Sequence, residues 1–305
     1  MPPATMVGAR KRPENPVAGI FWMLATMLWF IALDTVAKEL LTRSQLPLGQ
    51  VVWARFFFHF LIGIGSALIW RSHIISKALG WQIARSALLF LTTTLFNAGL
   101  ATTPLATATA IMFLSPIILT ALSHIVLGEP VGPRRWFGVA AGFLGALIIV
   151  RPGAEGFNHG ALFFLAAALV NSVYQLATRR VSQYDSPQCS FFYTALVGGV
   201  LSTFAVPFSW TAPNGIDWLL LISMGILGGV GHLFLIFAFD RAPAALVAPF
   251  AYSALIWASI SGFLLFGEIP DAWTVTGALI ISASGLYIFH RERLVARARG
   301  KAVER

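Results

Sequence analysis

Residues 104–130 of this chain read PLATATAIMFLSPIILTALSHIVLGEP, and residues 243–270 repeat the pattern as PAALVAPFAYSALIWASISGFLLFGEIP. A shift of 139 residues, from 104 to 243, superposes the initial proline and the Gly-Glu pair near the end. Each stretch is almost wholly apolar. At a helical rise of about 1.5 Å per residue, each can cross a hydrocarbon core about 30 Å thick. The sequence therefore predicts one type of membrane helix that occurs twice.

The repeat extends over nearly the whole chain. Shifts of 139 to 141 residues also superpose positions far from the two stretches, so the chain is predicted to contain two related halves. The additional matches are Gly19 with Gly160, Lys38 with Arg179, Pro47 with Pro187 and Gly138 with Gly277.

Ten stretches are long and apolar enough to span a bilayer, and the loops between them are short and contain proline or glycine. We therefore predict an all-α integral membrane fold of ten helices, five in each repeat. The predicted bounds are 17–38, 49–70, 81–102, 104–127, 134–151, 159–180, 188–209, 217–239, 243–266 and 272–290.

An odd number of spans in each repeat makes the second repeat enter the membrane from the opposite face. Such inverted repeats are typical of secondary transporters, because two similar bundles can exchange conformations and open a shared site to each side in turn. The predicted organisation is a tail over 1–16, five-helix repeats over 17–151 and 152–290, and a basic tail over 291–305.

The composition excludes other broad classes. The chain is 57% hydrophobic and 11% charged, whereas soluble proteins carry about 25% charged residues. The net charge of +9 comes from basic residues that flank apolar stretches. This is the pattern of lipid contact and membrane orientation, not of nucleic-acid binding. The single cysteine, Cys189, has no partner for a disulfide or a metal site, so we expect no cofactor and no metal.

The basic residues also predict the orientation. Of the 21 lysines and arginines, only Lys38, Arg43 and Arg151 fall on the side opposite the termini, and Arg55 falls inside a helix. The positive-inside rule then predicts cytoplasmic termini. The other seventeen are Arg10, Lys11, Arg12, Arg71, Lys77, Arg85, Arg134, Arg135, Arg179, Arg180, Arg241, Arg291, Arg293, Arg297, Arg299, Lys301 and Arg305.

The repeated Gly-Glu turns after the fourth and ninth helices make the chain resemble the drug/metabolite transporter superfamily, specifically its ten-helix EamA-type members. The resemblance covers about residues 17–290. It implies a multi-pass transporter of the bacterial inner membrane whose partners are a small-molecule substrate and the lipid bilayer, with a monomer as the simplest assembly. A YddG-type amino-acid exporter is the first expectation, and sugar, nucleotide-conjugate or drug transport is the alternative.

Other function classes remain as alternatives. A passive channel would share the polar lining of a carrier. An intramembrane enzyme would need a cluster of catalytic groups, and the sequence contains no zinc, serine-nucleophile or diphosphate motif. We therefore predict that the chain is not an enzyme.

Three charged residues fall inside or near the ends of the first two helices. Asp34 and Arg55 lie at similar depth and could form either a structural salt bridge or an ionisable gate. Lys38, one helical turn from Asp34, could compete for that carboxylate, but we expect its ammonium to extend to the interface.

Polar and aromatic residues at mid-depth are the candidates for substrate binding, with packing between helices as the alternative. Asn171 and Tyr174 share one helix face. Pro116 and Pro249 are the candidate hinges, because proline removes a helical hydrogen bond. Glu129 and Glu268 are expected to cap the turns that contain them. The predicted substrate-binding set is Trp29, Asn97, Asn171, Tyr174, His232, Tyr252 and Trp257.

Overall fold

The computed structural model describes residues 15–70, 74–127, 132–152 and 158–303, and every regular element among them is a helix. Ten spans are long and apolar enough to cross a membrane, as the sequence predicts. The fourth span consists of α4 and α5, and the ninth of α10, η2 and α11. The elements are α1 (Pro16–Thr42), α2 (Leu48–Trp70), α3 (Leu79–Leu100), α4 (Leu105–Met112), α5 (Leu114–Leu127), α6 (Pro133–Val150), α7 (Gly160–Val181), α8 (Pro187–Ala205), η1 (Val206–Ser209), α9 (Gly215–Arg241), α10 (Ala244–Val247), η2 (Ala248–Tyr252), α11 (Ser253–Phe266) and α12 (Ala272–Val303).

Local sequence explains where several helices begin and end. The Asn15 side chain accepts a hydrogen bond from the Ala18 amide and caps α1, and Asn214 with Asp217 forms a capping box at the start of α9. Gly267 adopts a left-handed conformation and ends α11. The last helix differs from the prediction because it continues beyond residue 290 to Val303.

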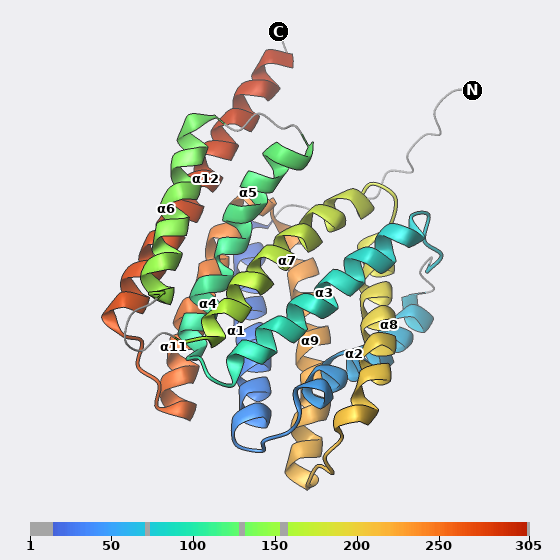
Figure 1. Ribbon diagram of the computed structural model, residues 1–305. Helices are drawn as coiled ribbons and strands as arrows, with labels where there is room; N and C mark the ends of the chain where they lie inside the picture. Colours follow the sequence, from blue (N-terminus) through green and yellow to red (C-terminus); the bar gives the residue numbers. More distant parts are fainter. Residues whose placement is uncertain (1–14, 71–73, 128–131, 153–157, 304–305) are drawn as a thin grey trace, which may run out of the picture.

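The two repeats pack with the symmetry that the sequence predicts. α1 of the first repeat packs along α9 of the second. Its equivalent in the second repeat, α7, packs along α3 of the first. The equivalent pairs α2 with α8 and α6 with α12 pack against each other. In Figure 1, α1 runs away from the face that carries the termini and α7 runs toward it. The repeats are therefore inverted.

Both equivalent spans that carry the Gly-Glu turns are interrupted. The fourth span breaks at Phe113, between α4 and α5, and the ninth passes through the 3-10 helix η2. Phe113 and Tyr252 correspond under the shift of 139, and their rings stack with centroids 4.5 Å apart. Pro116 lies in the first turn of α5 and Pro249 in η2. The prolines thus lie beside the interruptions, and their role as hinges stays a prediction.

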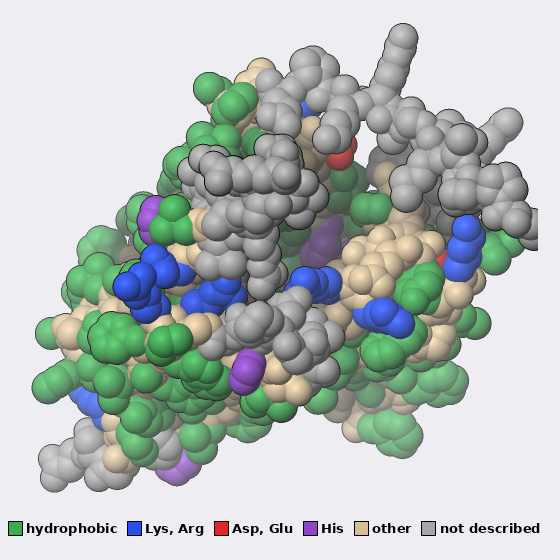
Figure 2. Space-filling model, turned by 90° about the horizontal axis from the view of Figure 1, so that it is seen from above, with side chains coloured by type: hydrophobic (Ala, Val, Ile, Leu, Met, Phe, Trp, Pro, Cys, Tyr) green, Lys and Arg blue, Asp and Glu red, His purple; other side chains and the backbone are tan. Residues whose placement is uncertain are grey.

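The surface is apolar around the bundle and hollowed on the face of the termini. Large hydrophobic side chains on many helices are exposed, as expected where helices contact lipid. Figure 2, which looks down on the face of the termini, shows lysine and arginine side chains on this face and a hollow near its middle with a histidine inside.

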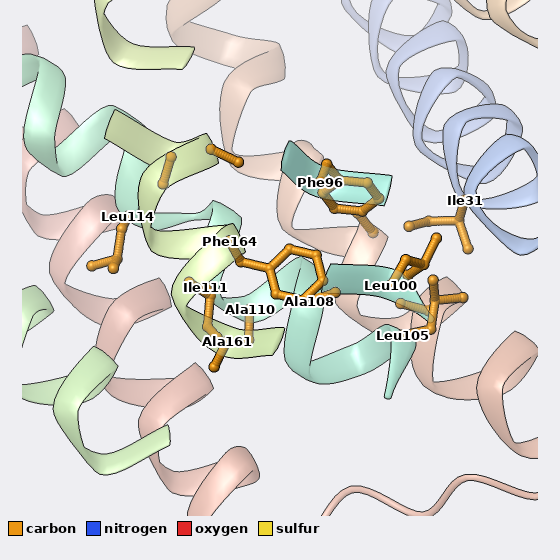
Figure 3. Packing of buried hydrophobic residues seen from close by; sticks show 14 of the residues in the cluster. Ile31, Phe96, Leu100, Leu105, Ala108, Ala110, Ile111, Leu114, Ala161 and Phe164 are labelled. Carbon is orange, nitrogen blue, oxygen red and sulfur yellow. The ribbon is translucent and has the colours of Figure 1, made fainter. Parts of the chain in front are cut away.

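Buried apolar side chains of several helices form one cluster, part of which is shown in Figure 3. Phe96 and Phe164 meet edge to face with centroids 5.2 Å apart. Leu100, Leu105 and Ile111 are fully buried beside them. This cluster joins α3 and α4 of the first repeat to α7 of the second, so it fixes the two halves together.

Glycine permits the close approach of α9 to α2. A methyl group at Gly225 would overlap the Phe58 side chain and the backbone of Phe58 and His59. Because backbone atoms cannot move aside cheaply, this position needs glycine.

We expect Gly225→Ala to destabilise the protein by about 1 to 3 kcal/mol, the usual cost of overpacking. The measurement is the midpoint of thermal unfolding in detergent. Gly80→Ala is the matched control, because Gly80 lies in α3 with open space around it. Equal midpoints for the two variants would contradict the close approach of α9 to α2.

Candidate functional site

Two side chains of opposite charge lie deep in the bundle. Asp34 precedes the end of α1 at Thr42 by eight residues, and Arg55 follows the start of α2 at Leu48 by seven. A rise of about 1.5 Å per residue places both about 10 to 12 Å inside that end of the bundle. Both residues are partly exposed.

The structural salt bridge, one of the two alternatives for these residues, is not formed. No nitrogen of Arg55 lies within 4.0 Å of an Asp34 carboxylate oxygen, although the two charges interact electrostatically. Among the described residues, none donates a hydrogen bond to Asp34 or accepts one from Arg55. The two charges are therefore close enough to attract each other but do not neutralise each other by contact.

Arg55 lies among helices of both repeats. It interacts electrostatically with Asp34 of α1 and Tyr174 of α7, and also with His59 of α2 and His232 of α9. These neighbours surround it from four helices, so its partial exposure is to an internal space. The hollow in Figure 2 opens from the face of the termini.

The two histidines form one wall of this space. Their ring centroids are 5.7 Å apart, and His232 also meets Phe30 of α1 at 5.2 Å. The His232 Nδ1 forms a hydrogen bond with the Gly228 carbonyl oxygen at 2.9 Å. His59 is buried against Phe191. These contacts fix both imidazole rings in place.

Buried polar atoms on tryptophan, histidine and asparagine side chains of several helices have no partner among the described residues. They are Trp29 Nε1, His59 Nε2, Asn97 Oδ1 and Trp257 Nε1. An unsatisfied buried donor or acceptor costs about 1 to 3 kcal/mol. Native structures tolerate few such groups, and those near a cavity are candidates for contact with a ligand.

The structure brings only part of the predicted binding set together. Tyr174 and His232 join Asp34 and Arg55 around the internal space, whereas the other members pack elsewhere. Asn97 is buried and donates to the Thr93 carbonyl of its own helix, and Asn171 donates to Ser115 at the interruption of the fourth span. Trp29 meets Phe234 edge to face, and Tyr252 stacks on Phe113. Trp257 packs against the apolar core.

Arg85 is a correction to the sequence analysis, which counted it with the loops. It lies inside α3 and is buried, with hydrogen bonds to Thr178 (2.9 Å), Thr194 (2.8 Å), the Ser190 carbonyl (3.1 Å) and the Tyr174 hydroxyl (3.2 Å). Arg85 therefore joins α3 to α7 and α8 and positions Tyr174.

A second group of hydrogen bonds joins helices near the face of the termini. Asp185, between α7 and α8, accepts hydrogen bonds from Ser76 Oγ, the Lys77 amide and Gln82 Nε2. Burial alone would raise the pKa of the Asp185 carboxyl, but these donors favour the charged form and lower the pKa below its ordinary value. The contact therefore stabilises the fold at neutral pH and is lost only as the pH falls through the lowered pKa.

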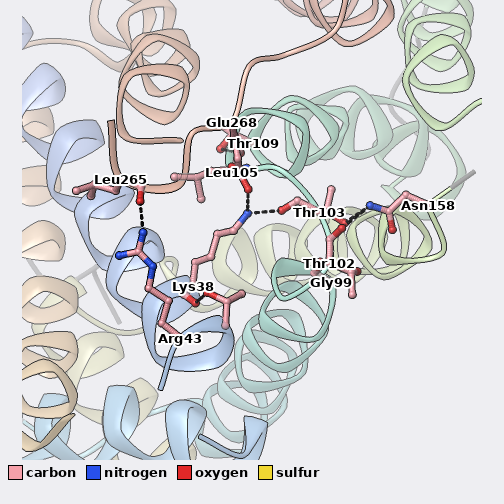
Figure 4. Close-up of polar contacts among 11 residues, drawn as sticks. Lys38, Arg43, Gly99, Thr102, Thr103, Leu105, Thr109, Asn158, Leu265 and Glu268 are labelled. Carbon is pink, nitrogen blue, oxygen red and sulfur yellow. Dashed lines mark hydrogen bonds and ion pairs between the residues drawn. The ribbon is translucent and has the colours of Figure 1, made fainter. Parts of the chain in front are cut away.

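The face opposite the termini is closed by a buried ion pair (Figure 4). Lys38 of α1 pairs with Glu268, which follows α11, and donates a second hydrogen bond to the Thr103 carbonyl at 2.7 Å. Glu268 also accepts from the Leu105 amide at the start of α4, at 2.9 Å. One network thus joins the first repeat to the second, one helical turn from Asp34.

This network corrects two expectations. The Lys38 ammonium does not extend to the interface, because its side chain is only 5% exposed. Glu268 was expected to cap the turn that contains it, but its carboxylate caps the start of α4 in the other repeat. Glu129, the corresponding residue of the first repeat, lies outside the described residues.

Weaker contacts extend the closure around the ion pair. The Arg43 guanidinium donates to the Leu265 carbonyl at 2.5 Å, and the Asn158 amide donates to the Thr102 carbonyl at 2.7 Å. Further out, Arg151 pairs with Asp271 at 2.6 Å, where both side chains are substantially exposed. The internal space is therefore sealed on this face by contacts between the repeats.

Comparison with known proteins identifies the family. A model of the EamA-like transporter family matches residues 17–151 and again 158–289. The chain belongs to this family. The two matches coincide with the two inverted repeats, so each family unit is one five-helix bundle.

Relatives of known name match the chain along nearly all of its length. An S-adenosylmethionine uptake transporter of Rickettsia felis is 30% identical, with 91% of this chain and 94% of the relative covered. A riboflavin transporter of Rhizobium johnstonii is 29% identical, with 92% and 93% covered. A solved crystal structure superposes with a TM-score of 0.63 at 21% identity, over 93% of this chain and 99% of that one, and shows the fold alone.

These comparisons confirm part of what the sequence predicts. The chain is a membrane transporter of small metabolites and not an enzyme. The amino-acid substrate and the YddG-type subgroup are not shown by them. The relatives named here carry different solutes, so family membership does not select the substrate.

The repeat contained a signal for the ion pair that the sequence analysis did not use. Lys38 corresponds to Arg179 and Glu268 to Glu129, so each half carries one basic and one acidic residue at equivalent ends of its helices. In an inverted repeat, such residues from opposite halves meet at one face. That reasoning would have paired Lys38 with Glu268.

Glu268→Gln should destabilise the protein by about 3 to 5 kcal/mol, because it leaves the buried Lys38 ammonium without its counter-charge. Adding Lys38→Met should recover part of this loss in a double-mutant cycle of thermal unfolding midpoints.

The exposed pair of Arg151 and Asp271 on the same face is the control. Asp271→Asn should cost at most about 1 kcal/mol. Additive effects of the Lys38 and Glu268 substitutions would show that the pair does not hold the two repeats together.

Proposed function

We propose that this protein is a secondary transporter that moves a small metabolite with an amino-acid moiety across the bacterial inner membrane by alternating access. The observation that carries the proposal is that Asp34 and Arg55, two accessible side chains of opposite charge inside a bundle of two inverted repeats, form no salt bridge with each other. A metabolite with both an acidic and a basic group would satisfy them.

S-adenosylmethionine is the first substrate candidate, because it carries an α-amino and an α-carboxyl group and is the named solute of a 30% identical relative. Free amino acids offer the same two groups and were the first expectation from the sequence. Riboflavin, named for another relative, lacks both groups, so the charges of this site favour it less.

The proposed cycle uses the contacts between the repeats. Here the internal space opens toward the termini, and the network around Lys38 and Glu268 closes the other face. Opening that face requires this network to separate while the contacts on the face of the termini close. The interruptions beside Pro116 and Pro249 are the places where the helices could bend.

In the proposed orientation the termini and the loop after α7 face the cytoplasm, and the loops after α1 and α8 face outward. The basic residues support it through the positive-inside rule. The predicted closed face is then the outer one, so the conformation described here would be open to the cytoplasm.

Transport is tested by counterflow in proteoliposomes loaded with unlabelled S-adenosylmethionine, an amino-acid mixture or riboflavin. We expect saturable counterflow for the first or second and not for the third; a passive channel would show none. His232→Ala should lower the rate about tenfold, which corresponds to the loss of about 1.4 kcal/mol of interaction with the solute.

His290→Ala is the matched control, because His290 is exposed near the end of the last span. Its counterflow should equal that of the wild type. Equal rates for the two histidine variants would move the site away from α9.

The orientation is tested by labelling single cysteines from outside intact cells, in a Cys189→Ser background. Ala212→Cys, exposed between α8 and α9, should react rapidly with an impermeant maleimide, and Gln183→Cys, exposed after α7, should react only after the membrane is opened. The reverse pattern would place the termini outside.

A further inference from the structure

We propose that Arg55 binds the carboxylate of the transported solute and Asp34 binds its cationic nitrogen, so that the site selects zwitterions. This inference deepens the proposed function and rests on it. It assigns the two ends of the solute to two helices of the first repeat.

The first support is the free-energy cost of leaving Asp34 and Arg55 without a salt bridge inside the membrane. A charge inside the membrane requires a partner or water, and opposite charges at equal depth normally pair. Asp34 and Arg55 attract each other but are more than 4.0 Å apart. A solute with both charges would neutralise each side chain without bringing them together.

The second support is the chemistry of the two groups. The guanidinium of Arg55 offers several N–H donors in a planar fork that suits a carboxylate. The carboxylate of Asp34 can only accept hydrogen bonds when ionised, which suits an ammonium. The hydroxyl of Tyr174, held by Arg85, lies on the Arg55 side of the space.

The third support is the wall next to the charges. Phe30 lies one helical turn from Asp34 on α1, and its ring meets His232. His59, whose ring lies 5.7 Å from that of His232, has an unpaired Nε2. Aromatic faces and unpaired ring nitrogens can receive the side chain or base of a solute whose zwitterionic end is held by the charges.

The test uses labelled S-adenosylmethionine counterflow with four competitors. S-adenosylhomocysteine keeps the ammonium and the carboxylate, decarboxylated S-adenosylhomocysteine lacks the carboxylate, N-acetyl-S-adenosylhomocysteine lacks the cationic nitrogen, and methylthioadenosine lacks both. For the wild type we expect S-adenosylhomocysteine to compete at least about tenfold better than each of the others, as one charge-assisted contact allows.

Variants assign each group to its residue. Arg55→Gln should bring S-adenosylhomocysteine and the decarboxylated competitor to within about twofold while the preference for a free amino group remains. Asp34→Asn should remove the preference for the free amino group while the carboxylate preference remains. Arg180→Gln and Asp240→Asn, both exposed near the face of the termini, should keep both preferences.

The outcomes separate this inference from the proposed function. If the wild type gives no counterflow with S-adenosylmethionine or any amino acid, the proposed function fails and the inference fails with it. If the wild type transports but the competitors lacking a charge act as well as S-adenosylhomocysteine, only the inference is overturned. The wild-type competition decides this even where a variant does not fold.

Discussion

Charge inside a low-dielectric bilayer is the constraint on which this structure depends, because each buried charge needs a counter-charge, hydrogen bonds or water. The protein meets this requirement in two ways within two turns of α1. Lys38 is neutralised by Glu268 and also donates to the Thr103 carbonyl, while Glu268 accepts from the Leu105 amide, and that network closes one face. Asp34 and Arg55 are left accessible in the internal space. The first arrangement holds the repeats together, and the second leaves two charges without a partner in contact.

The position of the pseudo-twofold axis follows from residues that meet their own equivalents. Phe113 and Tyr252 correspond in the two repeats, and their rings stack, which is only feasible close to the axis. The equivalent pairs α2 with α8 and α6 with α12 also pack against each other. Contacts on the axis can persist while the repeats tilt. The contacts of Lys38 and Glu268 lie toward one face, so they must separate when that face opens.

The sequence predicted the fold well because its signals are local or periodic. Apolar length predicted ten spans, and the shift of 139 predicted two inverted halves, which the packing of α1 with α9 and of α7 with α3 confirms. The side-chain network was predicted poorly because it is set by tertiary contact. Lys38 and Glu268 are 230 residues apart, and Arg85 was judged by its distance from a loop rather than by the polar residues of α7 and α8 around it. Tyr252 and Asn171 were predicted to bind substrate from their depth, and depth alone did not reveal that Tyr252 stacks on Phe113 and Asn171 donates to Ser115, both beside the interruption of the fourth span.

The separated charges also bear on how the carrier moves without solute. To pass between its two open forms, the protein must go through a state in which both faces are closed and the internal space loses water. With the proposed zwitterion bound, Asp34 and Arg55 would enter that state neutralised. Without it, two charges lose their water, and without a direct contact their mutual attraction offsets that loss only in part, which raises the free energy of the closed state. The loaded protein should therefore change conformation faster than the empty one. This difference favours exchange of solutes over net flow, and the direction of transport then follows from the solute gradients rather than from the fold.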